Sequence, residues 1–374
     1  MLILRMVILF CLLFLRDANA ANLLQAKDYK IILEKNNVFL TDNAWARDSE
    51  SFRFFDYNLA TTDSSGKEFA PVYEFKIDTS KVVLKNAQPG GLINTDKQLV
   101  ASEQGDKEFR VTGCPLSCKL EIHETSNSKN YELNVLTSIK KQLTILVPTW
   151  SPDANWIAFL SPTTTERLMD VFVVRVSDTV REIKPIGQTH IIATEDENTS
   201  YINWSQDNRR FYTKDSFAVF SIDPVKELYR PQSPLLQDVF QFNNPWKWSS
   251  DSRHILAYVP ELVDPNCSKQ EDIGICDLKI NVYVIDTDTG DTQKLFIKHG
   301  SFNDLKNFSA DFSPDRQFIV YAEMKSLFIM NIQTKTATKL TKKEDDYSHP
   351  SWSHDGKKII FNVKDKGVGL ITVE

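Results

Sequence analysis

The chain has 374 residues, of which 41% are hydrophobic and 25% are charged, and its formal net charge is −6 at pH 7. Acidic and basic residues are interspersed, which argues against the basic stripe of a nucleic-acid-binding protein. The hydrophobic fraction is sufficient for a large core, and the chain lacks strong helical periodicity. We therefore expect an all-β protein that folds as one domain.

The N-terminus has the pattern of an export signal. Arg5 is followed by an apolar run over residues 6–15, and Ala18-Asn19-Ala20 fits the small-x-small cleavage pattern. Arg16 ends the run before the ~20 apolar residues that a membrane span needs. We predict a signal peptide cleaved after Ala20 and a periplasmic or secreted protein with no transmembrane span; an uncleaved anchor is the alternative.

A motif of aromatic-Ser-x-Asp recurs along the chain, beginning at Trp150, Trp204, Trp248, Phe312 and Trp352. The shortest interval matches the ~40–45 residues of a four-stranded propeller blade, and the longer intervals allow loop insertions. Ser-Pro-Asp favours a type I turn, and each motif is followed by short apolar runs rich in β-branched residues. Each motif is therefore interpreted as the hairpin between the first and second strands of a blade.

The N-terminal third repeats less clearly. Trp45-Ala46-Arg47-Asp48 is interpreted as a divergent copy, and the strand pattern alone predicts a blade without the motif over residues 92–140. The fold prediction is a β-propeller of four-stranded antiparallel blades over residues 21–374, with seven blades counted and six or eight left open. A lone strand, Lys30-Ile31-Ile32-Leu33, is predicted to complete the last sheet and remove an open edge.

The segment His349-Pro350-Ser351-Trp352-Ser353-His354-Asp355-Gly356, followed by a strand, resembles the WD-like repeats of the TolB propeller family. The resemblance implies a propeller that binds partner peptides without catalysis. Similar repeats occur in the propeller lids of prolyl-oligopeptidase-type peptidases and in some secreted lyases. The chain departs from TolB because Trp45 follows the leader too closely for an α/β domain, and it has no Gly-x-Ser-x-Gly nucleophile motif.

Four cysteines follow the leader: Cys114, Cys118, Cys267 and Cys276. Proximity in sequence favours disulfides between the first two and between the last two, which an oxidising compartment permits. A zinc site with four thiolates is the alternative, although the spacing differs from that of zinc ribbons. The stretch from Asp286 to Asp291 superficially resembles a calcium loop and is interpreted as a hairpin turn.

Candidate site residues are expected in the loops that link successive blades at one rim. The candidates for binding a protein or peptide are Glu195, Asp196, Glu197, Trp246, Lys247, His299, Asp345, Asp346 and His349. Solvated loops without a binding role are the simpler interpretation. The enzymatic alternative is a metal-assisted polysaccharide lyase or hydrolase with His190, His299 and His349 as ligands, and a structural component without a site is a third possibility. We expect a monomer without a cofactor, and we identify no catalytic residue.

Overall fold

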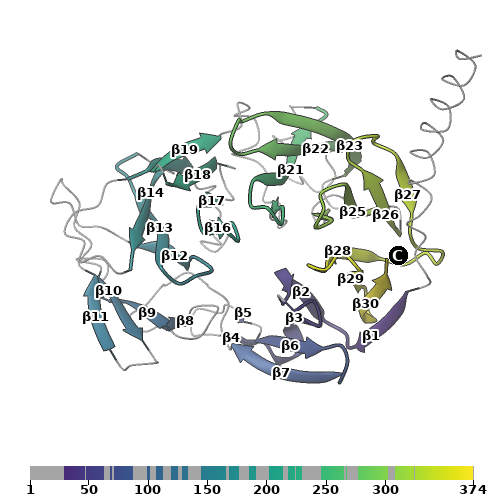
Figure 1. Ribbon diagram of the computed structural model, residues 1–374, viewed down its shortest axis with the longest axis horizontal. Helices are drawn as coiled ribbons and strands as arrows, with labels where there is room; N and C mark the ends of the chain where they lie inside the picture. Colours follow the sequence, from purple (N-terminus) through teal and green to yellow (C-terminus); the bar gives the residue numbers. More distant parts are fainter. Residues whose placement is uncertain are drawn as a thin grey trace, which may run out of the picture. The chain divides into compact units, whose positions relative to one another are not determined.

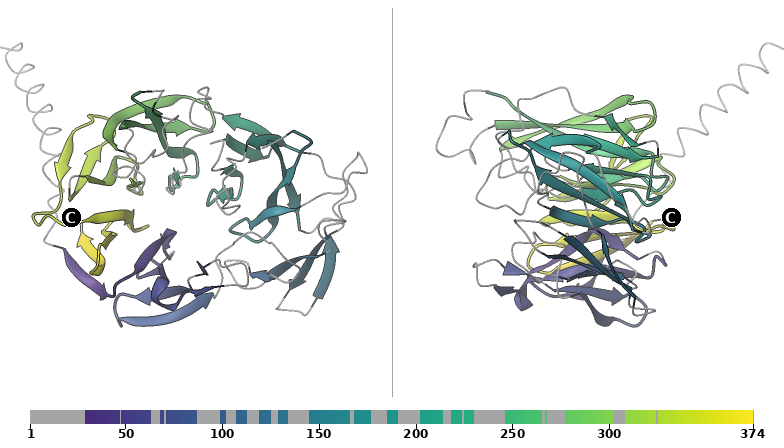
Figure 2. Two further views of the ribbon diagram at one scale, coloured as in Figure 1. Left: turned by 180° about the vertical axis from the view of Figure 1, so that it is seen from behind. Right: turned by 90° about the vertical axis from the view of Figure 1, so that its left-hand side faces the viewer.

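The computed structural model describes residues 29–46, 48–62, 68–69, 71–86, 99–101, 107–112, 119–124, 129–133, 145–165, 168–176, 185–190, 202–213, 218–223, 225–229, 246–264, 267, 277–301, 308–323 and 325–373. Most of these residues lie in strands and turns, and η1 (Tyr57–Leu59) is a short 3-10 helix. They form seven four-stranded antiparallel sheets and one two-stranded sheet (Figures 1 and 2). The protein is a β-propeller built from four-stranded blades, as the sequence predicted.

The chain divides into two compact units, and the first combines residues 1–87 with residues 308–374. Its described residues form three four-stranded sheets. The first sheet contains β2 (Val38–Trp45), β3 (Ser51–Asp56), β6 (Val72–Lys76) and β7 (Lys81–Asn86). The second contains β24 (Ala310–Phe312), β25 (Phe318–Glu323), β26 (Ser326–Asn331) and β27 (Ala337–Lys339). The third contains β28 (Tyr347–Trp352), β29 (Lys358–Val363), β30 (Gly367–Thr372) and β1 (Lys30–Glu34), and a small sheet pairs β4 (Thr61–Thr62) with β5 (Glu68–Phe69).

The second unit covers residues 88–307, and its described residues form four four-stranded sheets. The first contains β8 (Leu99–Ala101), β9 (Lys107–Thr112), β10 (Lys119–Glu124) and β11 (Lys129–Leu133). The second contains β12 (Leu146–Trp150), β13 (Trp156–Pro162), β14 (Leu168–Arg175) and β15 (Gly187–His190). The third contains β16 (Ile202–Trp204), β17 (Arg210–Thr213), β18 (Ala218–Ile222) and β19 (Val225–Tyr229). The fourth contains β20 (Lys247–Trp248), β21 (His254–Leu262), β22 (Asp277–Asp286) and β23 (Thr292–Ser301). The sheet of β8 to β11 confirms the blade predicted without the motif.

The N-terminal strand completes the C-terminal sheet, as predicted. β1 pairs antiparallel with β30, with Lys30 opposite Leu370 and Glu34 opposite Gly367 (Figure 1). Gly367 has φ +112°, and a Cβ added there would lie 1.9 Å from the carbonyl oxygen of Leu33. Glycine is therefore needed where the two strands meet.

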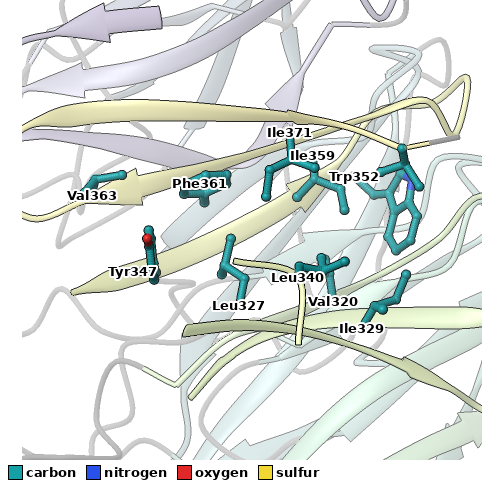
Figure 3. Close-up of a cluster of buried hydrophobic side chains, with 11 residues drawn as sticks. Val320, Leu327, Ile329, Leu340, Tyr347, Trp352, Ile359, Phe361, Val363 and Ile371 are labelled. Atoms are coloured by element: carbon teal, nitrogen blue, oxygen red, sulfur yellow. The ribbon is translucent and has the colours of Figure 1, made fainter. Parts of the chain in front are cut away.

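The core of the first unit lies between the faces of neighbouring sheets. In one cluster, Val320 and Leu327 from the sheet of β24 to β27, with Leu340 directly after β27, lie opposite Ile359 and Phe361 of β29 (Figure 3). A second cluster joins Phe52, Phe54 and Phe75 to Ile360, Val368 and Leu370 of the C-terminal sheet. Full burial of one such side chain contributes about 1.5–3 kcal/mol, so these clusters dominate the stability of the unit.

Each aromatic-Ser-x-Asp motif forms the predicted hairpin by a local hydrogen-bond network. In the first copy, Ser151 Oγ donates to Asp153 Oδ1 at 2.6 Å, and the same carboxylate oxygen accepts the backbone N–H of Asn155 at 3.0 Å. Ala154 between them has φ +55°. The divergent copy keeps this role, because Asp48 Oδ1 accepts the N–H of Ser51 at 3.1 Å. The repeated serine and aspartate therefore stabilise the hairpin turn through their hydrogen bonds.

Candidate functional site

The motif residues also hold neighbouring sheets together within each unit. The indole Nε1 of Trp45 donates to the carbonyl of Ser351 at 3.0 Å, and Trp204 Nε1 donates to the carbonyl of Thr149 at 3.3 Å. The N–H of Asp355 in turn donates to Ser49 Oγ at 3.1 Å. These contacts assign the repeated residues to the scaffold.

A lysine or arginine at the start of several second strands makes a further contact between sheets. The donors are Lys107, Arg210 and Lys358, and the acceptors are the carbonyls of Ala154, Ser252 and Ser49 respectively. Each acceptor carbonyl belongs to a motif turn residue with φ between +55° and +57°. Lys107 shows that the blade without the motif keeps this contact.

Two acidic residues of the predicted rim, Asp345 and Asp346, lie close to lysines in the structure. Asp345 forms an ion pair with Lys366 and accepts the hydroxyl of Tyr29 at 3.4 Å, and Asp346 lies 3.9 Å from Lys364 Nζ. Burial acts to raise the pKa of Asp345, but hydrogen bonds from Lys366 and from the backbone N–H of Asp346 outweigh it, so the pKa lies below its usual value. Asp345 is therefore a supporting residue rather than an open acidic group.

The three candidate histidines lie in strands rather than in the linking segments that the sequence predicted. His190 ends β15, His299 lies within β23, and His349 lies in β28. His299 is exposed, whereas His349 is partly buried at an irregularity of β28 and has φ +51°. No group of three or more His, Cys, Asp or Glu residues in the described ranges is placed to hold a metal ion.

The candidate tryptophan is part of the core. Trp246 is 1% exposed, its ring lies 5.8 Å from that of Tyr212, and its carbonyl accepts the Tyr212 hydroxyl at 2.5 Å. Its indole cannot contact a partner, which corrects its assignment to the binding rim. The neighbouring Lys247 is partly exposed in β20.

Several predicted residues lie outside the described part of the chain. These are Glu195, Asp196, Glu197, Cys114, Cys118 and Cys276. Cys267 is described and is buried. The roles predicted for the six residues outside the described ranges therefore stay predictions.

The stretch that resembles a calcium loop is the hairpin turn between β22 and β23, as predicted. Asp286 Oδ1 accepts the backbone N–H of Asp288 at 2.9 Å, and Gly290 has φ +78°. Arg253 binds both oxygens of Asp286, each at 3.1 Å from its Nε. Hydrogen bonds from the Arg253 side chain, opposed by burial, lower the pKa of Asp286 to about 2.

An apolar surface that the sequence analysis did not identify lies at one end of the first sheet. Phe39 at the start of β2 is 44% exposed, and Tyr57 and Leu59 in η1 are 46% and 50% exposed. The rings of Phe39 and Tyr57 meet edge to face, with centroids 5.5 Å apart. We call Phe39, Tyr57 and Leu59 the aromatic platform.

Two chain connections hold the aromatic platform in place. The backbone N–H of Tyr57 donates to the carbonyl of Asn37 at 3.0 Å, and Asn58 Nδ2 donates to the carbonyl of Asn36 at 2.7 Å. Beneath them, Lys35 pairs with Asp56, whose side chain is only 1% exposed. The connection from β1 to β2 is thereby joined to the one that follows β3, which favours a preorganised surface.

The chemistry of the aromatic platform suits recognition rather than catalysis. Large aromatic side chains with two χ angles provide contact area at low entropic cost, and exposed amides such as Asn37 and Asn58 provide a polar surrounding. The sequence signal that could have located it is Tyr57-Asn58-Leu59, two large apolar residues placed directly after the end of a strand.

Comparison with known proteins gives a likeness of fold. No protein-family model and no curated protein matches the chain. Among solved structures it is similar to the β-propeller domain of Swd1 from Myceliophteria thermophila, with a TM-score of 0.46 and 8% identity over 94% of this chain and 100% of that chain.

Two oligogalacturonate lyases are also similar. One, in complex with manganese, has a TM-score of 0.49 and 11% identity; the other, from Vibrio parahaemolyticus, has a TM-score of 0.47 and 13% identity. Each match covers 94% of this chain and 96% of the other. At these scores and identities no functional property is carried over. Within the described ranges, no helix has the length and apolar character that crossing a membrane requires.

Proposed function

We propose that this chain is an exported propeller, related to TolB, that binds a protein or peptide partner through the aromatic platform. The observation that carries the proposal is the exposure of Phe39, Tyr57 and Leu59 on connections that are hydrogen-bonded to each other. Exposed aromatic side chains in a rigid setting are the residues that most often dominate binding energy in protein interfaces. The proposed site thus moves from the acidic loops to an apolar surface.

The proposed cellular setting rests on the sequence. The basic start, apolar run and small-x-small pattern of the first 20 residues support cleavage after Ala20 and a periplasmic or secreted location. We propose that residues 21–374 form one propeller domain. N-terminal sequencing of the exported protein tests the cleavage, and an N-terminus still at Met1 would contradict it.

The disulfides of an oxidising compartment belong to the same proposal. The bonded state of Cys267 supports the pair that it would form with Cys276. We propose Cys114–Cys118 as the second pair on the basis of sequence proximity. Alkylation before and after reduction, followed by mass measurement, counts the free thiols, and four free thiols would refute both pairs.

The partner proposal is tested with Tyr57→Ala and a matched control. Wild-type protein, Tyr57→Ala and Ile297→Ala are each used to capture partners from the compartment to which the protein is exported. Ile297 is 42% exposed on β23 and is a large apolar residue outside the platform. Proteins enriched by wild type and Ile297→Ala but not by Tyr57→Ala are then purified and titrated against all three.

A hot-spot aromatic costs about 2 kcal/mol or more when truncated, which weakens binding about 30-fold. We expect that loss for Tyr57→Ala and an unchanged Kd for Ile297→Ala. Equal affinity of the three proteins for every captured partner would refute the platform as the binding site. Similar melting curves for all three would exclude unfolding as the cause.

A further inference from the structure

The outer strand of the first sheet exposes three consecutive apolar side chains. Val82, Val83 and Leu84 in β7 are 44%, 41% and 55% exposed. β7 pairs with β6 and ends the strand order of its sheet, so its second edge has no partner among the described strands. An edge strand of this kind presents backbone N–H and C=O groups that can pair with another chain.

The outer strands β23 and β27 lack this composition. β23 contributes Ile297 as its single large exposed apolar residue, and the exposed strand β27 reads Ala-Thr-Lys. Native proteins commonly block edges with charge, proline or bulges. In β7 Lys81 precedes the apolar run and Lys85 follows it, and no charge interrupts the three apolar residues.

We propose that β7 binds an extended segment of another protein by β-strand addition. The added strand would pair with the free edge of β7, and its backbone would supply the main-chain hydrogen bonds of the new ladder. Val82 and Leu84 lie opposite Phe75 and Tyr73 of β6, whereas Val83 lies opposite Glu74 and points to the other face. Apolar residues at alternate positions of the added strand would therefore meet an apolar neighbour on either face.

The charges at the end of β7 indicate the chemistry of the partner. Lys81 lies directly opposite Lys76 of β6, and both side chains are exposed. Like charges directly opposite each other in a sheet are destabilising. An acidic residue of the incoming strand beside Lys81 would relieve this repulsion, so the preferred partner is an extended apolar segment flanked by acidic residues.

The same charges disfavour a second copy of this chain as the occupant. In antiparallel self-pairing centred on Val83, Lys81 of each copy would face position 85 of the other, which is also a lysine. A register shifted by one residue would instead set position 85 opposite Val82. Neither arrangement gives the lysines an opposite charge, which an acidic partner segment provides.

The test uses the full chain and a synthetic, fluorescently labelled peptide of alternating threonine and valine with glutamate at both ends. Three versions are compared by fluorescence anisotropy: the parent peptide, one with lysine in place of glutamate, and one with N-methylated valines that cannot donate backbone hydrogen bonds. The protein variants are Val83→Glu and the matched control Val263→Glu, since Val263 is also an exposed valine, at 56%. This inference does not depend on the aromatic platform, and Tyr57→Ala should bind the parent peptide as wild type does.

We expect saturable binding of the parent peptide with a Kd below about 1 mM, and at least tenfold weaker binding of both altered peptides. Val83→Glu should weaken the parent peptide at least tenfold, and Val263→Glu should not change it. No saturable binding, or equal binding of the N-methylated peptide, would overturn strand addition. Wild-type protein that dimerises in sedimentation, when Val83→Glu does not, would assign the edge to a second copy and also overturn the proposal.

Discussion

The closure of the C-terminal sheet by β1 can be tested with a single added methyl group. Gly367→Ala places a Cβ 1.9 Å from the carbonyl oxygen of Leu33 and 2.8 Å from the backbone nitrogen of Lys35. Both are backbone atoms, so the clash cannot be relieved by rotating a side chain. The end of β1 must move away from β30, at the pairs that Leu33 and Glu34 make.

The expected cost has two parts. A non-glycine residue at positive φ costs about 1–2 kcal/mol. Displacing two residue pairs of β1 from β30 would also break hydrogen bonds, at about 1 kcal/mol each. Some of the packing of Leu33 against the neighbouring cluster would be lost as well. We therefore expect Gly367→Ala to destabilise the protein by about 3–5 kcal/mol.

Gly290→Ala separates the two parts. Gly290 also has positive φ, at +78°, but a Cβ there meets nothing within 4 Å. It should cost only the conformational part, about 1 kcal/mol. Hydrogen exchange measured by mass spectrometry provides the local assay, because Gly367→Ala should speed exchange of residues 30–34 and Gly290→Ala should not.

The reasoning would be refuted if the two variants unfolded at the same temperature and left exchange of residues 30–34 unchanged. Deletion of residues 21–34 supplies a second check. It should sharply lower the melting temperature, and in that shortened chain Gly367→Ala should cost little more than its conformational part, because the carbonyl of Leu33, the nearest clashing group, is gone. Full additivity of the deletion and the substitution would contradict the contact.

Two further predictions concern carboxylates. Because the pKa of Asp286 is lowered to about 2, its contribution is present above about pH 4 and is lost as pH falls from 4 towards 2. Asp286→Asn should lower the free energy of unfolding by about 1 kcal/mol at pH 7, a small value because Arg253 is 45% exposed. The difference from wild type in urea unfolding should vanish near pH 2. A difference independent of pH would contradict this. Asp345→Ala should destabilise more than Asp346→Ala, by about 1 kcal/mol, because Asp345 alone of the two is largely buried and paired with Lys366. Equal melting curves of the two variants would show that this pairing contributes nothing.

Much of the fold could be predicted because its determinants are local in sequence. The turn of each motif is made by a serine, an aspartate and a residue at positive φ within five positions, as Ser151, Asp153 and Ala154 show. The closing strand could be predicted because a lone strand precedes the first blade in the sequence and can complete the last one. β1 and β30 confirm this inference.

The site could not be predicted because its determinants are distant in sequence. Asp345 is paired by Lys366 of the β29–β30 turn, and no local pattern announces that contact. Trp246 and Trp248 stand two positions apart, look alike in the sequence and both pack against Tyr212. Only the folded structure shows that Trp246 is fully buried whereas Trp248 is partly exposed. His299 was assigned to a loop because the ten-residue length of β23 is not visible in the spacing.

The residues that recur in this chain already make hydrogen bonds that join neighbouring sheets. Trp45, Trp204, Lys107 and Lys358 each donate to a backbone carbonyl of a neighbouring sheet within their unit. A group that already satisfies a backbone acceptor cannot bind a partner without leaving that acceptor unpaired, at a cost of about 1–3 kcal/mol. Recognition is therefore expected at residues that break the repeat, and Tyr57, which no motif contains, is exposed at such a position. Binding that followed the repeated tryptophans rather than Tyr57 would require the sheets to separate, and faster hydrogen exchange in the motif hairpins with partner bound would reveal it.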